Sequence, residues 1–488
     1  MERCRAAAAG VARPACPSPF AVARWYAAAI GAVPNTPGGD VVALMNPRSF
    51  RGVVVGITLV CAVAVTPGAR AEHWPQWRGP RGDGISAESG IPEGWSKTKH
   101  VAWRTPLPGR AGATPCVWGD RIFLTSNEGD DLVLLCVNAA DGAIRWKRTV
   151  GGGNKDARSG EGNSASPSPC TDGEHVWVFF GTGILACYTT DGAEVWKTDV
   201  NERFGKIDIQ FGMTSTPVLD GDALYLQLIH GAMKLDDDTR TGKVIRLDAR
   251  TGKTVWAVDR VTDAQFECKH SYASPVLYRH DGREFLVVHG ADCITGHALA
   301  DGRELWRFGG LNGPTDTNPK PHDQTFRFVA SPVCAPGTIV VPTCKGGPTL
   351  ALTVGDALSG DCTGKADVVK WINPVTPDVS IPLVTDGLVY LLHKDGKLQC
   401  VDLETGKDVY FQRTHTGQHR TSPLLAAGRI YFGSNDGWVT IVRAGREFEQ
   451  LDSVDFGGEA ITASLVVSGG TLYVRSYDAL YAIKADRP

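Results

Sequence analysis

The chain has 488 residues, a formal net charge of −3, 42% hydrophobic residues and 57 glycines. This length allows one large core or several domains, and the balanced charge offers neither the basic stripe of a nucleic-acid-binding protein nor an acidic tail. No stretch after residue 72 is apolar enough to predict a membrane-spanning segment.

The N-terminal part has the order of an export signal. Residues 45–51 are basic, residues 53–65 are apolar, and the segment ends in Ala-Arg-Ala at residue 71, a pattern at which signal peptides are cleaved. We therefore predict a signal peptide over residues 45–71 and an exported protein of the periplasm or the cell exterior, with no transmembrane segment in the mature chain. Residues 1–44, rich in alanine and proline, are interpreted as a mis-assigned start or a disordered leader.

After an N-terminal extension over residues 72–100, a repeat with a period of roughly 40–60 residues fills the rest of the chain. Each copy opens on a proline element, usually Ser/Thr-Pro, with Ser464-Leu465 in its place in the last copy, and passes through a glycine turn into an apolar run. It closes on a polar turn with Asp and Gly, followed by a large aromatic residue. The clearest copy reads LDARTGKTVW and ends at Trp256. Short strands and glycine turns at this period predict the blades of a β-propeller.

The number of repeats predicts how the ring closes. Eight openings occur after residue 113, but only seven aromatic closers follow them: Trp146, Trp196, Trp256, Trp306, Trp371, Tyr410 and Phe448. The missing closer is Trp103, which precedes the first opening. We therefore predict an all-β fold, an eight-bladed propeller over residues 101–488 with four-stranded blades. The N-terminal strand 101–106 completes the last blade beside residues 480–483, so no blade is left with an open edge.

Ten cysteines follow the predicted cleavage site, and export would permit disulfides. Several recur at equivalent repeat positions, as Cys116 and Cys170 do after the same proline, and such positions lie at least one blade apart. The sequence therefore predicts free thiols in the core. It contains no Cys-x-x-Cys zinc motif or haem attachment motif.

Repeats of the form LDxxTGKxxW opened by Ser-Pro strands resemble the PQQ-like β-propeller repeat. That repeat is shared by quinoprotein alcohol dehydrogenases and by BamB-like propellers of outer-membrane assembly. Residues 73–86 (HWPQWRGPRGDGIS), 269–275 and 415–423 are most similar to exported members of the planctomycete type. The resemblance implies the propeller fold and two alternative functions. One is a protein that binds a partner or ligand, and the other is an oxidoreductase that uses PQQ with calcium.

The chain departs from the dehydrogenases that it resembles. They have an adjacent Cys-Cys pair over the cofactor, and this sequence contains none. No stretch could be matched to their Asp base or to their Glu and Asn calcium ligands, and no haem domain is present. The sequence thus favours an exported, non-catalytic and monomeric propeller without catalytic residues and without a cofactor. A PQQ-dependent oxidoreductase with a diverged site is the alternative.

A binding site is predicted at one mouth of the central channel. The loops that enter the innermost strands and the loops between second and third strands share one face of a propeller. From the first set we predict as ligand-binding residues Asn163, Gln210, His270, Arg327, Asp378, His419 and Arg420, with Glu459 beside them. The second set supplies Asp292, Lys345, His393, Asn435 and Tyr477.

Cations outnumber carboxylates at this mouth, so we expect a polar or anionic ligand or a protein partner. No metal is expected, because the histidines lack further residues at ligand spacing. The alternative is that these polar groups only pair with one another.

Overall fold

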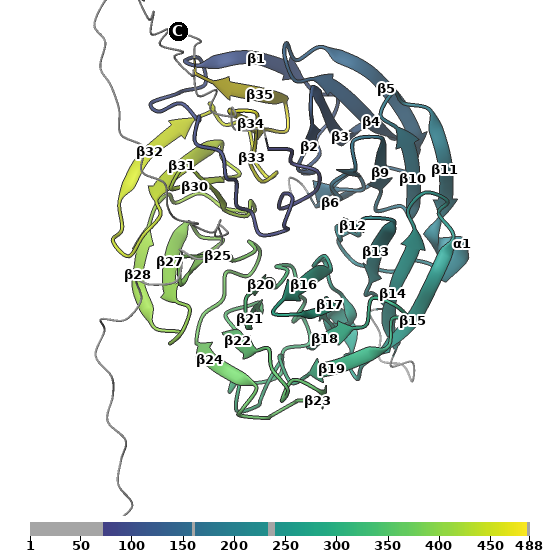
Figure 1. The fold of residues 1–488 in the computed structure, drawn as a ribbon, viewed down its shortest axis with the longest axis vertical. Coiled ribbons are helices and arrows are strands. Elements are labelled where there is room, and N and C mark those ends of the chain that lie inside the picture. Colours follow the sequence, from purple (N-terminus) through teal and green to yellow (C-terminus); the bar gives the residue numbers. More distant parts are fainter. Residues whose placement is uncertain (1–71, 159–161, 233–239, 486–488) are drawn as a thin grey trace, which may run out of the picture. The chain divides into compact units, whose positions relative to one another are not determined.

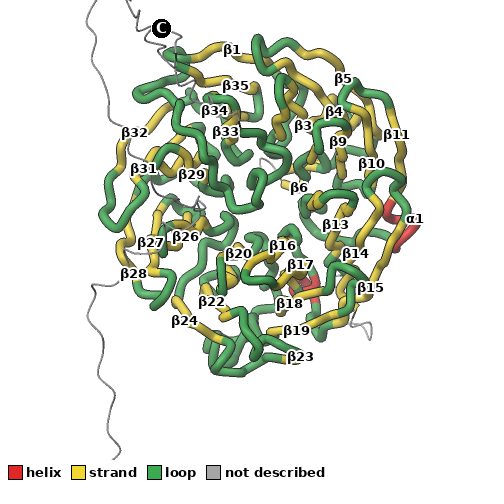
Figure 2. The backbone as a smooth tube through the Cα atoms, in the orientation of Figure 1, coloured by secondary structure: helices red, strands yellow, loops and turns green. Residues whose placement is uncertain are grey.

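The structure, a computed structural model, describes residues 72–158, 162–232 and 240–485. The predicted signal peptide and the leader before it lie outside the described residues. Strands and loops make up nearly all of the described chain (Figure 2). The helical elements in this part are the short helix α1 (Val200–Phe204) and the 3-10 turn η1 (Phe266–Lys269).

Eight antiparallel sheets follow one another around a ring, and we number them as blades 1 to 8 (Figure 1). Blade 1 contains β2 (Cys116–Trp118), β3 (Arg121–Glu128), β4 (Asp131–Asn138) and β5 (Ile144–Gly151). Blade 2 contains β8 (Cys170–Thr171), β9 (His175–Phe179), β10 (Ile184–Thr189) and β11 (Glu194–Asp199). Blade 3 contains β12 (Val218–Asp220), β13 (Ala223–Leu228), β14 (Arg240–Asp248) and β15 (Thr254–Val261). Blade 4 contains β16 (Val276–His280), β17 (Arg283–Gly290), β18 (Cys293–His297) and β19 (Glu304–Phe308).

The second half of the ring repeats this pattern. Blade 5 contains β20 (Val333–Ala335), β21 (Thr338–Pro342), β22 (Thr349–Thr353) and β24 (Val369–Asn373). Blade 6 contains β25 (Leu383–Thr385), β26 (Leu388–Leu392), β27 (Lys397–Asp402) and β28 (Asp408–Arg413). Blade 7 contains β29 (Leu424–Ala426), β30 (Arg429–Gly433), β31 (Trp438–Arg443) and β32 (Gln450–Asp455). Blade 8 contains β33 (Val466–Ser468), β34 (Thr471–Arg475), β35 (Ala479–Lys484) and β1 (Val101–Pro106).

The predicted closure of the ring is confirmed. β1 pairs antiparallel with β35, with Val101 opposite Ile483 and Thr105 opposite Leu480 (Figure 1, purple beside yellow). Because the N-terminal strand supplies the outer edge of the last blade, the two ends of the repeat region are joined by hydrogen bonds, and no blade is left incomplete.

The closing tryptophans of the repeat join one blade to the next. In five of them the indole Nε1 donates to a carbonyl in the polar turn of the following blade. These bonds run from Trp103 to Ala139 (3.0 Å), Trp146 to Thr190 (3.1 Å), Trp196 to Ala249 (2.9 Å), Trp256 to Leu299 (3.0 Å) and Trp371 to Leu403 (2.7 Å).

The glycine of that turn lies on the indole face. At Gly302, for example, φ is 76°, and an added Cβ would lie 2.6 Å from a ring atom of Trp256. The turn therefore needs a residue that tolerates positive φ and has no side chain. The spacing of Asp, Gly and Trp in the repeat thus records a contact between neighbouring blades.

The Ser/Thr-Pro openings form a second ring of contacts, which lacks the link between blades 5 and 6 because Ile381 stands where the other openings have Ser or Thr. The hydroxyl of each Ser or Thr accepts a hydrogen bond from the backbone of the preceding blade. The links are Thr114 N to Ser168 (2.9 Å), Ser168 N to Thr216 (3.1 Å), Thr216 N to Ser274 (2.8 Å), Ser274 N to Ser331 (2.8 Å), Ile381 N to Ser422 (3.0 Å), Ser422 N to Ser464 (3.0 Å) and Ser464 N to Thr114 (3.1 Å). These buried backbone donors are therefore satisfied across blade boundaries, which explains the recurring hydroxyl.

Two features depart from regular four-stranded blades. The connection between β22 and β24 contributes β23 (Gly360–Asp361), which pairs parallel to β19 and makes the sheet of blade 4 five-stranded. A separate hairpin of β6 (Asp156–Arg158) and β7 (Gly162–Asn163) precedes blade 2. Both features arise in long connections, which tolerate insertions better than strands do.

The cysteines follow the sequence prediction. All ten in the described residues are free, and nine of them are buried, with Cys334 partly exposed. Burial raises the pKa of thiols such as Cys136 and Cys400 to about 12, so they behave as small core residues.

The N-terminal extension runs over the inner part of the ring (Figure 1). Its Arg78 is buried, and the guanidinium donates to the carbonyls of Pro423 (2.5 Å), Asp83 (2.8 Å) and Pro382 (3.4 Å). The extension is therefore part of the folded unit, held by a buried cation whose donors are directed at backbone oxygens of blades 6 and 7.

Candidate functional site

The loops that enter blades 5, 6 and 7 enclose a pocket of about 240 Å³, which we call the mouth pocket. Turns between the second and third strands of blades 5 and 6 complete its wall. Its lining residues are Arg327, Val329, Lys345, Asp378, Val379, Lys394, Gln418, His419 and Arg420. The structure therefore brings together four of the seven predicted ligand-binding residues, namely Arg327, Asp378, His419 and Arg420, with Lys345 from the second predicted set.

Asp378 is the carboxylate of this lining, and two lysines hold it. Its Oδ1 accepts from the backbone N–H of Lys345 at 3.0 Å, and its Oδ2 lies 2.5 Å from the Nζ of Lys394. Asp378 has a φ of 72°, a left-handed conformation that Asp tolerates better than most residues. The two contacts orient its carboxylate toward the turns of blades 5 and 6.

The guanidinium of Arg327 is held from two sides. Its Nη1 donates to the carboxylate of Glu267 at 2.8 Å, and its Cζ lies 4.8 Å from the ring centroid of Phe211. The ammonium of Lys345 contacts the hydroxyl of Thr325 and lies 3.9 Å from the carboxylate of Asp323. These contacts position the cationic groups before any ligand arrives, which lowers the entropic cost of binding one.

His419 is buried at the wall of the mouth pocket, and it is not the cation that the sequence suggested. Its Nδ1 donates to the carbonyl of Gly417 at 2.9 Å. Burial is the main cause that lowers the pKa of this imidazole to about 4. His419 is therefore neutral at pH 7, because an imidazolium at this depth would lose its hydration.

Three predicted residues do not line the mouth pocket. Asn163 is buried in the β7 segment, where its amide donates to the carbonyl of Arg110 and to Asn127 Oδ1 (3.0 Å). Gln210 is exposed in the segment between α1 and β12.

His270 is fully buried and its Nε2 lies 2.8 Å from the carbonyl of Gly231. Burial lowers its pKa, so it does not contribute the positive charge expected of it. Sequence position alone put these three on the right loops but could not show how deeply their side chains are packed.

Glu459 of the first predicted set and three residues of the second set are engaged elsewhere. The carboxylate of Glu459 accepts from Ser476 (2.7 Å) and Tyr481 (2.9 Å) and pairs with Lys97 of the N-terminal extension (2.9 Å). His393 contacts Gln399 (2.9 Å), and Tyr477 is buried. The backbone N–H of Asn435 donates to the carbonyl of Gln418 at 2.7 Å. These contacts support the fold of the mouth and do not enlarge the pocket.

Asp292, a predicted residue of the second set, carries a carboxylate that is mostly buried. It lies in the turn between β17 and β18, and 14% of its side chain is exposed. Burial raises the pKa of this carboxyl to about 7, and the hydrogen bond from Asn312 opposes the shift.

Lys394 was missed by sequence reasoning. It lies in the turn between β26 and β27, next to the predicted His393. The second set was chosen from the turns between second and third strands, and Lys394 lies in one of these turns. Only the structure shows that Lys394, and not its neighbour His393, lines the pocket.

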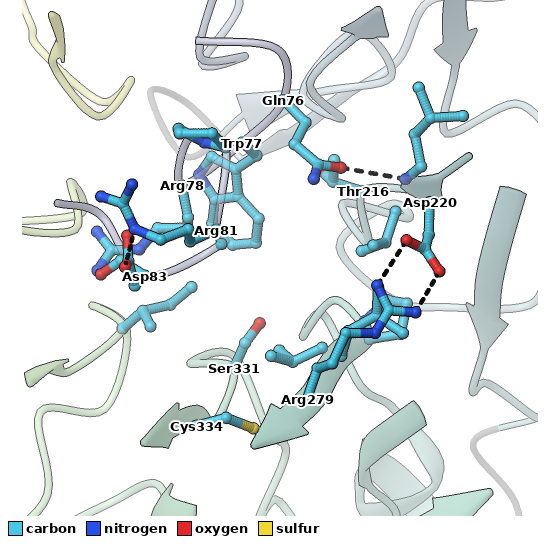
Figure 3. A pocket seen from close by; sticks show the side chains of 18 of the residues that line it. Gln76, Trp77, Arg78, Arg81, Asp83, Thr216, Asp220, Arg279, Ser331 and Cys334 are labelled. Carbon is cyan, nitrogen blue, oxygen red and sulfur yellow. Dashed lines mark hydrogen bonds and ion pairs between the residues drawn. The ribbon is translucent and has the colours of Figure 1, made fainter. Parts of the chain in front are cut away.

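A second cavity of about 390 Å³ lies between the N-terminal extension and the innermost strands of blades 3, 4 and 5 (Figure 3). Trp77 and Arg81 line it on one side, and Arg279 and Asp220, joined by paired hydrogen bonds of 2.9 and 2.8 Å, face it from the other. Asp220 ends the innermost strand, so this cavity lies toward the end of the channel remote from the entering loops. No sequence signal pointed to it.

The resemblance implies PQQ and calcium, and the mouth pocket is one place where they could bind. Its described lining residues include no Phe, Tyr or Trp ring on which a planar quinone could stack, and the single lining carboxylate is already paired with Lys394. Calcium requires several oxygen ligands. The donor set of the mouth pocket therefore does not fit this cofactor pair.

Comparison with known proteins identifies relatives of the chain. A family model described as "Outer membrane protein assembly factor BamB" matches residues 94–225, 133–409 and 291–488. A polyvinylalcohol dehydrogenase of Sphingopyxis sp. (strain 113P3) is 25% identical over 407 residues, which are 78% of this chain and 56% of that protein. The chain thus spans just over half the length of this curated relative.

Two solved structures share the fold at lower identity. BamB from Moraxella catarrhalis has a TM-score of 0.54 and 15% identity, covering 78% of this chain and 99% of that one. A europium-containing methanol dehydrogenase has a TM-score of 0.63 and 13% identity, covering 84% of this chain and 90% of that one. Among the residues that the structure describes, no helix has the length and apolar character needed to cross a membrane.

Proposed function

This chain belongs to the family of PQQ-like β-propeller repeat proteins described as "Outer membrane protein assembly factor BamB", and we propose that it is an exported, non-catalytic propeller. In this proposal the mouth pocket binds carboxylate groups of a small ligand or of an acidic segment of a partner protein. The observation that carries it is the excess of positive charge in the pocket. Arg327, Lys345, Lys394 and Arg420 line it together with one carboxylate, that of Asp378.

The charges leave room for an incoming anion. Glu267 neutralises Arg327 from behind, and Asp378 neutralises Lys394. Lys345 lies 3.9 Å from Asp323, which does not line the pocket, so four cationic side chains of the lining still face one lining carboxylate. The Arg420 guanidinium matches a carboxylate in shape and hydrogen-bond direction. A charge-assisted hydrogen bond of this kind contributes roughly 1.5–3 kcal/mol. The same cations disfavour a metal ion in this pocket.

The size of the pocket limits which ligands it can hold. At about 240 Å³ it is smaller than pockets that enclose a drug-sized molecule, which start at roughly 300 Å³. It is large enough for one or two carboxylate groups. A side chain or a small organic acid therefore fits better than a whole cofactor.

Calorimetric titration with citrate and with a hexaglutamate peptide tests the proposal and separates the two sources of carboxylate. We expect binding of at least one probe that weakens with salt. Arg420→Ala should reduce its affinity about ten- to hundredfold, since 1.4 kcal/mol corresponds to one decade. Arg413→Ala is the matched control, because Arg413 is exposed on β28 outside the pocket. Equal affinities of the two variants, or no binding of either probe, would refute the proposal.

Structural support by Arg420 is the competing explanation. It predicts that Arg420→Ala lowers the melting temperature while the affinity for the probe stays unchanged. Both quantities are therefore measured on the same variant.

The similarity to polyvinylalcohol dehydrogenase supports a second candidate, a PQQ-dependent oxidoreductase with a diverged site. The lack of an adjacent cysteine pair and the donor set of the mouth pocket argue against it. We expect no dye-linked oxidation of alcohols or of polyvinyl alcohol after addition of PQQ and calcium. Turnover above that of a control without PQQ would make this second candidate the function of the protein.

Export is part of the proposal. The basic, apolar and Ala-Arg-Ala segments before residue 72 support it, and the mature chain is expected to begin at Glu72. N-terminal sequencing of protein recovered from the periplasm or the medium measures this. A secreted chain that still carried residues 1–44 would contradict both the cleavage site and the proposed start.

A further inference from the structure

Three side chains with metal-binding atoms converge beside blade 4. Cys268 lies in η1, Asp292 in the turn between β17 and β18, and His322 in the long loop between β19 and β20. One ligand atom from each, a sulfur, a carboxylate oxygen and an imidazole nitrogen, lies within 4.8 Å of the other two. The three residues are far apart in the sequence, so only the fold places them together.

We propose that Cys268, Asp292 and His322 bind a zinc ion. Thiolate, imidazole and carboxylate are the ligands that zinc uses in proteins, whereas calcium and magnesium prefer oxygen alone. The inference does not depend on the ligand of the mouth pocket.

Asn312 organises the three ligands from within the protein. Its buried amide nitrogen lies 3.3 Å from Cys268 Sγ and 3.3 Å from Asp292 Oδ2, and it donates to the carbonyl of Asp323 at 3.1 Å. The amide oxygen accepts from the backbone N–H of Asp323 at 3.1 Å. An amide N–H directed at a sulfur and at a carboxylate stabilises both as anions, which are the forms that bind a metal.

The carboxylate of Asp292 leaves one acceptor unused. Its Oδ1 is buried and accepts no hydrogen bond from the part of the chain that the structure describes. A positive φ of 60° at Asp292, after 51° at Ala291, fixes the turn that holds this group in place. A buried carboxylate oxygen without a donor is costly, and coordination to a cation would satisfy it.

The geometry requires a small closure and a defined proton transfer. Zinc bonds of roughly 2.0–2.3 Å place tetrahedral ligands roughly 3.3–3.7 Å apart, so the three atoms must approach by about 1 Å. His322 can do this, because 47% of its side chain is exposed on a loop. The thiol of Cys268 now points to the carbonyl of Asp323 at 3.2 Å, and on binding it releases its proton to solvent. Water completes the fourth position.

A second group, Asp172, Glu174 and His175, has similar spacing but a different environment. The guanidinium of Arg250 lies 2.8 Å from Asp172 and 3.4 Å from Glu174, so a cation already occupies this place. That group therefore supplies the control for non-specific binding.

Cobalt(II) titration of the chelator-treated full chain tests the proposal. We expect one equivalent to bind with a thiolate-to-cobalt absorption band, and zinc to displace it. Cys268→Ser should abolish the band. His322→Ala should weaken zinc binding by about 100-fold or more, since loss of even an outer partner costs 10–100-fold. His175→Ala and Cys136→Ser are the matched controls, and both should retain the band and the affinity.

The outcomes separate a metal site from a structural role. Because His322 is exposed, His322→Ala should fold like the parent, and zinc should raise the melting temperature of the parent but not of this variant. Absence of the band in the parent, or its persistence in Cys268→Ser, would overturn the proposal. So would a zinc affinity that His322→Ala and His175→Ala lower equally.

Discussion

Trp103 is the side chain whose removal tests the ring closure most directly. It lies on β1, 9% of it is exposed, and its Nε1 donates to Ala139 of blade 1 at 3.0 Å. Its ring covers Gly142 and lies 6.0 Å from that of Tyr473. Trp103→Ala therefore removes the aromatic contact that joins the last blade to the first.

The expected loss can be estimated from these contacts. Truncation of a buried Trp to Ala costs roughly 3–5 kcal/mol, and the hydrogen bond contributes about 1 kcal/mol. Part of the free energy lost with the hydrogen bond is recovered when water reaches the carbonyl of Ala139. We therefore expect Trp103→Ala to lower the free energy of unfolding by about 4 kcal/mol, a large fraction of the roughly 5–15 kcal/mol typical of folded proteins. Trp103→Phe should cost much less, because it keeps most of the apolar contact.

Urea denaturation followed by circular dichroism measures these changes. Trp371→Ala is the matched control, since Trp371 makes the same contact between blades 5 and 6 at 2.7 Å. Both alanine variants should lose similar stability. If Trp371→Ala costs several kcal/mol and Trp103→Ala costs less than about 1 kcal/mol, the N-terminal strand does not stabilise the ring as argued.

Three other properties can be tested on the same protein. Arg78→Met should lower the free energy of unfolding by about 2–4 kcal/mol and make residues 72–100 sensitive to proteases, because three carbonyls lose their buried donor; the exposed Arg81→Met should do neither. Burial lowers the pKa of His289 to about 3 and of His297 and His419 to about 4. Between about pH 6.5 and 4 only the unfolded chain takes up these protons. The free energy of unfolding should therefore be highest above this window and fall as the pH drops through it. Equal urea midpoints at about pH 7 and pH 5 would contradict this. The chain from Glu72 onward should show ten reactive thiols when unfolded without reductant, but at most Cys334 should react promptly when folded; fewer than ten would indicate disulfides.

The architecture could be predicted from the sequence alone, because the signals of the repeat are local and recur in every copy. The Asp, Gly and Trp spacing of each copy reports a turn against the indole of the previous blade, as at Gly302 and Trp256. The Ser/Thr-Pro openings report the ring of hydroxyl bonds. Counting openings and closers was enough to place Trp103 in the last blade, since a closed ring needs one closer for each blade.

Strand order also determined which loops share a mouth, and so the sequence placed Arg327, Asp378, His419 and Arg420 together. The sequence could not determine how deeply each of these side chains is buried. Whether a polar side chain faces solvent or is packed inside depends on neighbours from other blades. His270 and His419 are therefore neutral buried groups, while Lys394, next to the predicted His393, faces the pocket.

Other features became visible only in the folded chain. The second cavity forms where the N-terminal extension meets three blades, and Cys268, Asp292 and His322 meet across a long loop without any motif spacing. A periodic sequence pattern reports only those contacts that are repeated from blade to blade. A contact made once, between segments with no common register, leaves no pattern in the chain and is decided by packing alone.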